Sequence, residues 1–352
     1  MSTTQLPTSE QAPPGGATAG HRGAGALSRL LESRVVVQYG LLPVVLVGVL
    51  IAGEILAPGV LSPSNLSSMT RFGVEIGILG FAEMVVIIMG GGGIDLSVAS
   101  TAAVTQVSLA VLLRGGIELW LGVAISLAIG LALGALNGFF ILGLGVPALV
   151  ATIGTYFGYA GLALVIANGV NIADFPSSYL TIGQGDVVGI PVEFIFIFIP
   201  VAIVLGYVTS RTKFGHEIRL TGTNERAALL SGINVRRLRF SGYVIAGMLA
   251  AIVGVVESSR FGTAQPVADS TYLLTAVTIA VLGGVDIFGG EGTILGVVLA
   301  TAVVTIFEYA FSLAQINAVI ELGSVGVMLI VVVLGQVGLK SLRSYAARRS
   351  SA

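Results

Sequence analysis

Four consecutive glycines at residues 90–93, followed by Asp95 and Ser97, form the first group of residues that could contact a polar ligand. A glycine run cannot sustain a stiff helix, because each glycine costs up to about 1 kcal/mol relative to alanine. Asp95 and Ser97 are residue types that cap a following helix. Two interpretations stay open: a helix broken beside a solute path, and a tight turn with an ordinary cap.

A second group lies in a basic segment, residues 210–239. Thr223 or Asn224 can cap a short helix over residues 225–231, and Gly232 can end it. An acidic residue at the start of that helix suits the positive end of the helix dipole.

Ala227 and Ala228 give this short helix a small face that can pack closely. A capped helix between two flexible basic stretches is typical of a docking element for a cytoplasmic partner. The alternative is a basic loop whose helix only lies on a membrane surface.

Several kinds of chemistry are excluded by residue type. The chain has no cysteine, which excludes thiol catalysis, disulfides and cysteine metal sites. Its two histidines, His21 and His216, lie outside the apolar segments, so no metal site is expected. Lys213 and Lys340 are the only lysines, and neither follows a glycine-rich phosphate loop, so the chain has no P-loop for ATP hydrolysis.

The composition shows what kind of elements must position these residues. Of 352 residues, 55% are hydrophobic and only 10% are charged, whereas soluble domains carry about 25% charged residues. Glycine, at 49 residues, favours close helix packing in lipid. These values predict an all-α polytopic membrane protein, embedded in the lipid bilayer, and exclude soluble enzymes, nucleic-acid binders and secreted disulfide scaffolds.

A helix needs about 20 mainly apolar residues to cross the hydrocarbon core. On this basis the sequence predicts ten spans, at residues 39–57, 74–92, 97–113, 119–142, 147–168, 190–209, 240–258, 272–288, 292–311 and 322–338.

The distribution of positive charge predicts the orientation of these spans, because cytoplasmic loops carry an excess of lysine and arginine. Outside the region before the first span, the 210–239 loop and the region after the last span, the positive residues are only Arg71, Arg114 and Arg260. With ten spans, all three basic regions fall on the cytoplasmic side, so both termini are expected there.

The domain organisation follows from these spans. We expect a disordered cytoplasmic tail at 1–25, an interfacial helix at 26–38, a transmembrane domain at 39–338 with a cytoplasmic loop at 210–239, and a basic cytoplasmic tail at 339–352.

Five carboxylates lie inside or near the predicted spans. Glu83 is the deepest, and because a charge at the bilayer centre costs at least about 3 kcal/mol, we expect it to face the bundle interior or a wet cavity. Glu54, Glu257 and Glu308 lie near span ends, where interfacial exposure is the simpler interpretation. Glu75 is the fifth of these carboxylates.

Glycines recur in two further patterns. Residues 283–287 (GGVDI) repeat the order of residue types at 92–96 (GGIDL), and both strings are predicted on the same side of the membrane. The repeat could mark an internal duplication, but in a glycine-rich chain coincidence is the favoured explanation. GxxxG spacings predict close helix packing within the bundle, at Gly130, Gly134 and Gly138, at Gly154 and Gly158, and at Gly292 and Gly296.

Four blocks, in order, resemble the permeases of sugar-type ABC importers. Residues 92–100 (GGIDLSVAS) are similar to that family's GGIDLSVG signature. Residues 137–138 (NG) with 146–154 (VPALVATIG) resemble its NG…IPxFIxTLG segment. Residues 222–235 (GTNERAALLSGINV) resemble its GxNxxAAxxSGI segment, and residues 282–293 (LGGVDIFGGEGT) its GGTSLxGGxGT run. Asp286 departs from the family's usual Ser or Thr.

This resemblance implies partners and roles. Such permeases work as a homo- or heterodimer of permeases, with two cytoplasmic ATP-binding-cassette ATPase subunits or one fused tandem ATPase, and with an extracytoplasmic solute-binding protein. Carried over, the ATPase-coupling residues are Gly222, Asn224, Ala227, Ala228, Ser231 and Gly232. The candidate residues of the translocation path are Gly92, Gly93, Asp95, Ser97 and Glu83.

The function that the resemblance implies is import of a monosaccharide or sugar-like solute across the bacterial cytoplasmic (inner) membrane. The chain would be a transport subunit, not an enzyme, and would bind no cofactor, because a partner hydrolyses the ATP. An alternative is an ion-coupled secondary carrier or channel, suggested by Glu83 and the broken helices; another, within the family, is a nucleoside or branched-chain amino-acid permease.

Overall fold

The computed structural model describes residues 34–173, 175–317 and 319–334. The predicted tails at 1–25 and 339–352 lie outside the described residues, as does most of the predicted interfacial helix at 26–38. Residues 34–38 of that interfacial segment belong to the first described helix.

Ten helical segments of the described part correspond one to one to the ten predicted spans. They are α2 (Arg34–Leu56), α3 (Pro63–Ile88), α4 (Val98–Arg114), α5 (Leu119–Gly138) with a π-helical extension η1 (Phe139–Gly143), α6 (Ala148–Ile166), α8 (Ile199–Arg211) preceded by the π-helical turn η2 (Phe194–Phe198), α11 (Val235–Phe261), α12 (Thr271–Leu282), α13 (Ile294–Leu313) and a helix over Val319–Leu334.

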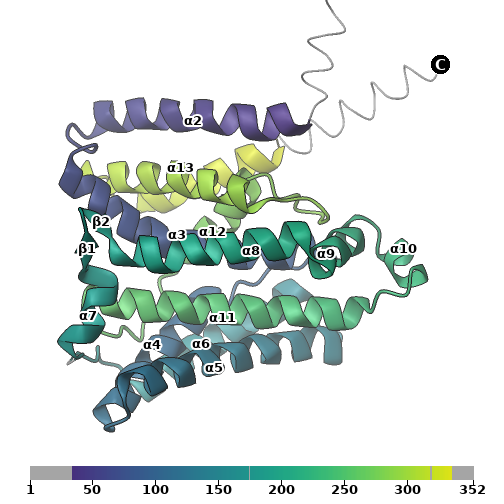
Figure 1. Cartoon of the computed structure of the whole chain (residues 1–352), viewed down its shortest axis with the longest axis horizontal. Helices are drawn as coiled ribbons and strands as arrows, with labels where there is room; N and C mark the ends of the chain where they lie inside the picture. Colours follow the sequence, from purple (N-terminus) through teal and green to yellow (C-terminus); the bar gives the residue numbers. More distant parts are fainter. Residues whose placement is uncertain (1–33, 174, 318, 335–352) are drawn as a thin grey trace, which may run out of the picture.

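Short elements fill the two long connections. Between α6 and η2 lie α7 (Ser177–Gln184) and an antiparallel pair of two-residue strands, β1 (Asp186–Val187) and β2 (Ile190–Pro191). Between α8 and α11 lie α9 (Lys213–Thr223) and α10 (Glu225–Leu230). In Figure 1, α7 and the strands lie at one end of the bundle and α10 projects from the other. We call these the α7 end and the α10 end.

Two helices differ from their predicted bounds for local reasons. α3 begins eleven residues before the predicted start at 74, because Ser62 caps it by accepting from the Asn65 amide and Pro63 occupies its first position. α12 ends at Leu282, before the predicted 288, where Gly284 takes a positive φ of 83°.

α3 lies at the centre of the bundle, in contact with α11, α12 and α13, and is buried from Gly73 to Ile88. α11 also packs closely on α5, as Figure 1 shows. The glycine spacing permits this crossing: a Cβ at Gly134 would fall on the Tyr243 carbonyl oxygen, and one at Gly130 on the Gly247 carbonyl. The predicted packing role is confirmed for this helix pair.

The other glycine pairs behave differently from each other. Gly296 lies against the carbonyl oxygen of Gly283, so it brings α13 close to α12 as predicted. The prediction is wrong for Gly292, which precedes α13 and has a φ of 154°. In α6, Gly154 and Gly158 meet no atom within 4 Å. The prediction that they pack within the bundle is wrong, because their face of α6 points away from the other described helices.

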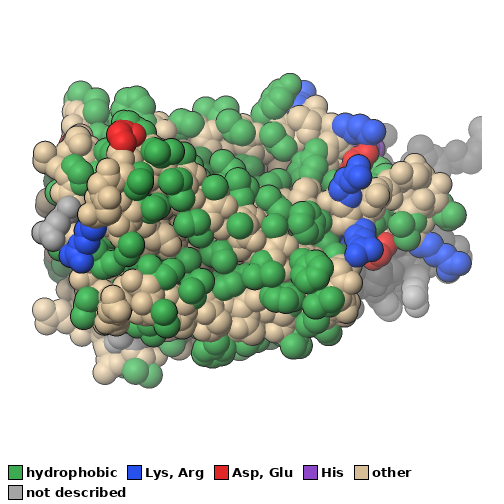
Figure 2. All heavy atoms as spheres, turned by 90° about the horizontal axis from the view of Figure 1, so that it is seen from below, with side chains coloured by type: hydrophobic (Ala, Val, Ile, Leu, Met, Phe, Trp, Pro, Cys, Tyr) green, Lys and Arg blue, Asp and Glu red, His purple; other side chains and the backbone are tan. Residues whose placement is uncertain are grey.

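Surface charge is concentrated at the two ends of the bundle. The face in Figure 2 is apolar and uncharged along its middle, with Lys and Arg side chains gathered mostly at the α10 end. Five described helices are long and apolar enough to cross a membrane by length and composition alone, and four shorter helices are apolar. The chain is therefore an all-α polytopic membrane protein.

Candidate functional site

Three segments that are far apart in the sequence meet at the α10 end. The amide of Gly290, in the loop between α12 and α13, donates to the carbonyl oxygen of Ile88 at the end of α3 (2.7 Å). Gly222, near the end of α9, lies against both of these groups, and Gly289 lies against Gly90. We call Gly90, Gly222, Gly289 and Gly290 the glycine junction. A Cβ at any of them would meet another segment within 3.0 Å.

The break after α3 is confirmed. Gly90, Gly91 and Gly92 all have positive φ values, between 68° and 70°, which only glycine adopts readily. Because Gly289 touches Gly90, the prediction that the two GG-aliphatic-Asp strings lie at one side of the membrane is also confirmed.

The two strings share a local geometry. In the first, Asp95 Oδ1 accepts from the amide two residues on, at Ser97 (3.0 Å), and in the second Asp286 Oδ1 accepts from the amide of Phe288 (3.0 Å). The same Asx turn therefore follows both glycine pairs. The glycines before the two turns differ, since Gly92 has a φ of 70° whereas Gly283, at the same place in the second string, has a φ of −66°.

One arginine connects α10 to this junction. Arg239, on α11, donates from Nη2 to Glu225 Oε2 (2.8 Å) at the start of α10, and from Nε to the Met89 carbonyl oxygen (3.4 Å). Its guanidinium also faces Gly91, where a Cβ would collide with it. In the sequence, Arg239 is one of several arginines in the basic loop, and nothing distinguishes it from the others.

The predicted capping of α10 is confirmed. Asn224 Oδ1 accepts from the Ala227 amide (3.0 Å), Ser231 Oγ donates to the Ala227 carbonyl oxygen (2.9 Å), and Gly232 follows with a φ of 79°. The stretches on either side are the helices α9 and α11, so the prediction that they are flexible is wrong.

The two alanines of α10 do not form one shared packing face. Ala228 is only 2% exposed and Ala227 is exposed. The projecting tip instead presents Leu229 and Leu230, which are 54% and 86% exposed. The sequence shows these two leucines inside a polar loop, but their exposure follows from the structure alone.

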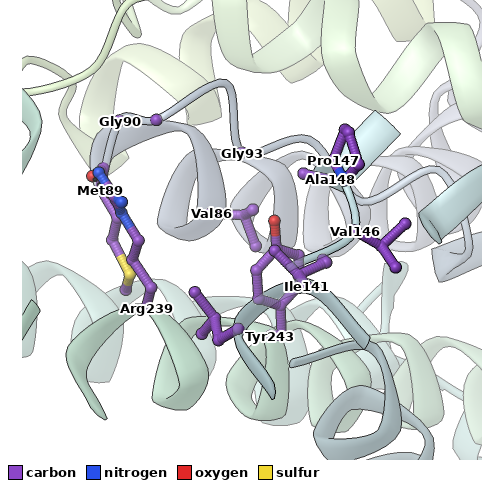
Figure 3. A pocket seen from close by; sticks show the side chains of 12 residues that line it. Val86, Met89, Gly90, Gly93, Ile141, Val146, Pro147, Ala148, Arg239 and Tyr243 are labelled. Carbon is purple, nitrogen blue, oxygen red and sulfur yellow. Dashed lines mark hydrogen bonds between the residues drawn. The ribbon is translucent and has the colours of Figure 1, made fainter. Parts of the chain in front are cut away.

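Beside the glycine junction lies a cavity of about 200 Å³. Figure 3 shows Met89 and Arg239 on one side of it and Val146, Pro147 and Ala148 on the other. Of the predicted path residues, Gly93 lines this cavity. Gly92 is exposed and meets no atom within 4 Å.

Asp95, Ser97 and Glu83 are instead buried together and do not line this cavity. Asn137 Nδ2 donates to Asp95 Oδ1 (3.2 Å) and to Ser97 Oγ (2.6 Å), and the Tyr159 hydroxyl donates to Asn137 Oδ1 (3.1 Å). Glu83 Oε2 accepts from the Asp95 amide (3.3 Å). Asn137 and Tyr159 were missed as members of this cluster, because they join it only through contacts between helices.

The prediction that Asp95 or Ser97 caps the third span is wrong. Ser97 occupies the N-cap position of α4 but makes no side-chain cap bond, and Asp95 binds Ser97 itself. The cluster fixes the broken segment against α5 and α6, where Thr152 also donates to the Ile94 carbonyl (3.2 Å). These side chains thus position the backbone of the break.

We expect Asp95→Ala to lower the free energy of unfolding by about 2–4 kcal/mol, because the buried Ser97 amide and hydroxyl lose their shared acceptor and Asn137 keeps only Ser97 Oγ. Thermal unfolding of the purified protein in detergent measures the loss. Asp186→Ala removes a half-exposed carboxylate and is the control, with an expected change of at most about 1 kcal/mol. Equal losses of stability in both variants would contradict the conclusion that Asp95 holds the backbone of the break in position.

The remaining carboxylates form a second charged region at the α7 end. Glu257 and Glu308 are buried and hydrogen-bonded, to Gln106 (3.2 Å) and Thr275 (2.8 Å), so their predicted interfacial exposure is wrong. Glu75 is fully buried and bound to Arg260. Glu54 is half-buried and accepts from the backbone that follows α2.

Three further ions, Arg71, Glu193 and Asp186, complete this region. Arg71 binds Glu193 (3.0 Å) and Asp186 (2.9 Å), and donates to the Gly183 carbonyl oxygen (2.6 Å). These bonds hold α3 to the segment that carries α7 and the strands.

Comparison with known proteins identifies the family. Residues 65–333 match the family described as the branched-chain amino acid transport system permease component. The autoinducer 2 import system permease protein LsrD of Enterobacter sp. (strain 638) is 33% identical over 267 residues, covering 74% of this chain and 81% of that relative. LsrD of Escherichia coli (strain K12) is 33% identical over 285 residues, covering 78% and 86%.

One solved structure, PsaBC from Streptococcus pneumoniae in complex with Fab, contains a chain with a TM-score of 0.47 and 15% identity, covering 81% of this chain and 94% of that chain. The matched family, which extends over most of the chain and includes both glycine breaks and the α10 loop, decides the classification. The chain belongs to the branched-chain amino acid transport system permease family, and it is a permease component of a sugar-type ABC importer.

Proposed function

We propose that this chain is the subunit through which an ATP-driven importer moves a monosaccharide or sugar-like solute across the bacterial cytoplasmic membrane. The ATP is hydrolysed by two ATPase subunits, or one fused tandem ATPase, bound at α10. The chain itself binds no cofactor. A second permease copy, identical or related, and an extracytoplasmic solute-binding protein complete the transporter.

The observation that carries this proposal is the projecting, capped α10 with its exposed Leu229 and Leu230. Exposed apolar side chains on a helix are the groups that enter a hydrophobic groove of a partner when a helix docks there. The exposed arginines of the same end, including Arg226, Arg236 and Arg237, support a cytoplasmic location, because positive residues are retained on that side. An even number of spans then puts both termini in the cytoplasm.

The contacts of α10 support a route by which ATPase movement reaches the membrane segments. A shift of α10 pulls on Arg239 through Glu225, and Arg239 holds the end of α3 at Met89. The same shift acts on Gly222, which touches the α12–α13 loop at Gly290. Both broken segments therefore move with α10.

Two observations bear on the solute. The relatives' names state that they import autoinducer 2, which supports a sugar-like solute. The family's description names branched-chain amino acids, which keeps an amino acid as the second candidate.

Leu230→Asp tests the docking role. We expect this substitution to raise the dissociation constant for the ATPase by about thirtyfold, so that the tagged permease loses most of its ATPase during purification, because an interface anchor contributes about 2 kcal/mol or more. Leu230 is 86% exposed, so the substitution leaves the bundle intact. ATPase content and ATP-dependent sugar uptake are measured together.

Val188→Asp is the matched control, since Val188 is 97% exposed at the α7 end. It should retain the ATPase fully. Equal ATPase retention by Leu230→Asp and wild type would contradict docking at α10. Sugar uptake in proteoliposomes driven by a proton or sodium gradient, without any ATPase, would contradict the proposed energy source.

A further inference from the structure

A cavity of about 390 Å³ opens at the α7 end, on the side opposite α10. It lies between the first part of α3, the end of α11, the start of α12, the end of α13 and the start of the Val319–Leu334 helix. Its size is within the range of small-molecule sites, about 300–1,000 Å³. None of the candidate path residues read from the sequence lines it.

The lining combines carboxylates, hydroxyls and aromatic rings. Glu308 is only 5% exposed, and Thr275 binds its Oε1, while its Oε2 has no hydrogen-bond partner among the described residues. Ser312 follows one helical turn later on α13 and is exposed to the cavity. Phe72 and Tyr309 supply aromatic faces. A buried acceptor with a free oxygen, beside a hydroxyl and flat rings, suits a ligand with hydroxyl donors and apolar C–H faces.

The charges of this cavity disfavour other kinds of ligand. Asp269, Glu308 and Glu321 line it, so an anion is repelled. Arg260 is the one cation among its described lining residues, and Glu75 already engages two of its nitrogens (2.6 and 2.7 Å). No group of three or more potential metal ligands occurs among the described residues, which disfavours a metal ion.

We infer that this cavity binds a neutral, hydroxyl-rich solute of monosaccharide size at the extracytoplasmic mouth of the permease. The inference rests on the proposed function, because that function sets the orientation and the solute class. The cavity is the place where a solute released by the binding protein first contacts the permease.

Two substitutions test the site in the full-length chain, purified into nanodiscs. Glu308→Gln keeps the size and the Thr275 bond but replaces the free acceptor oxygen with an NH2 donor, and Ser312→Trp fills the cavity from an exposed position. The probes are radiolabelled ribose, xylose, arabinose, galactose and rhamnose, measured by equilibrium dialysis. We expect wild type to bind at least one sugar, and both variants to bind it at least about tenfold more weakly.

Leu313→Trp is the matched control, because Leu313 is the exposed neighbour of Ser312 and does not line the cavity. It should bind like wild type, and thermal unfolding verifies that all variants are folded. Binding of leucine or of an organic amine in place of every sugar would overturn the inferred ligand class.

Uptake in the native host separates this inference from the proposed function. If ATP-dependent sugar uptake occurs and is unchanged by Ser312→Trp and Glu308→Gln, the cavity is not the site, while the proposed function stands. If the host takes up none of the five sugars through this chain, the result contradicts the proposed function itself, and with it the inference that rests on it.

Discussion

Gly222→Ala is expected to lower the free energy of unfolding by about 3 kcal/mol and to reduce ATP-dependent uptake by more than about tenfold. The new Cβ would collide with the Ile88 carbonyl oxygen and the Gly290 amide, which are backbone atoms that cannot rotate away. Relief of the collision separates α9 from α3 and from the α12–α13 loop. Thermal unfolding in detergent and uptake per folded molecule measure the two effects.

Gly154→Ala is the matched control for this experiment. Gly154 lies within a helix, α6, and a Cβ there meets nothing within 4 Å. We expect the free energy of unfolding to stay unchanged or to rise by up to about 1 kcal/mol, because alanine is the better helix former. If Gly222→Ala unfolds like wild type and transports normally, the glycine junction is not a tight contact in the working protein.

The junction explains why backbone contacts suit a coupling device. Long side chains have several rotamers and can absorb a displacement, whereas packed backbones pass it on. At the junction, Gly222 of α9 touches the two broken segments directly, and the Gly290 amide bonds to the Ile88 carbonyl. A movement of α10 that is transmitted through α9 therefore reaches both breaks at once.

The fold could be predicted from the sequence to a large extent, and particular elements show why. Each span is a local run of apolar residues, so hydropathy located all ten in the described part. The cap of α10 depends on Asn224 and residues within four positions of it, and it too was predicted. The start of α3 at Ser62 was missed because its first turns are polar, although the Ser-Pro capping signal was present.

The candidate site could be predicted only in part. The glycine break at 90–92 is a local feature, but Gly222 and Gly289, which contact it in the folded protein, are distant in the sequence. Asp95 was a good candidate from its type, yet its bond to Asn137 forms between segments 42 residues apart. The α7-end cavity has no sequence motif, because five helices contribute to it.

Arg260→Met is expected to lower the free energy of unfolding by about 3–5 kcal/mol. Glu75 is fully buried and depends on two bonds from Arg260, at 2.6 and 2.7 Å. Without them only the Tyr272 hydroxyl (3.1 Å) remains to stabilise its charge. Thermal unfolding of the purified protein measures the loss.

The double variant Glu75→Gln/Arg260→Met identifies the cause of that loss. It removes both charges and retains an acceptor for Tyr272, so we expect it to recover about 1–3 kcal/mol relative to Arg260→Met alone. Lys213→Met is the matched control, because Lys213 is 89% exposed in its pair with Glu217 and its loss should cost at most about 1 kcal/mol. If the double variant is as unstable as Arg260→Met, the arginine acts through its packing on Phe261, 4.0 Å from the ring centroid, and not through its charge.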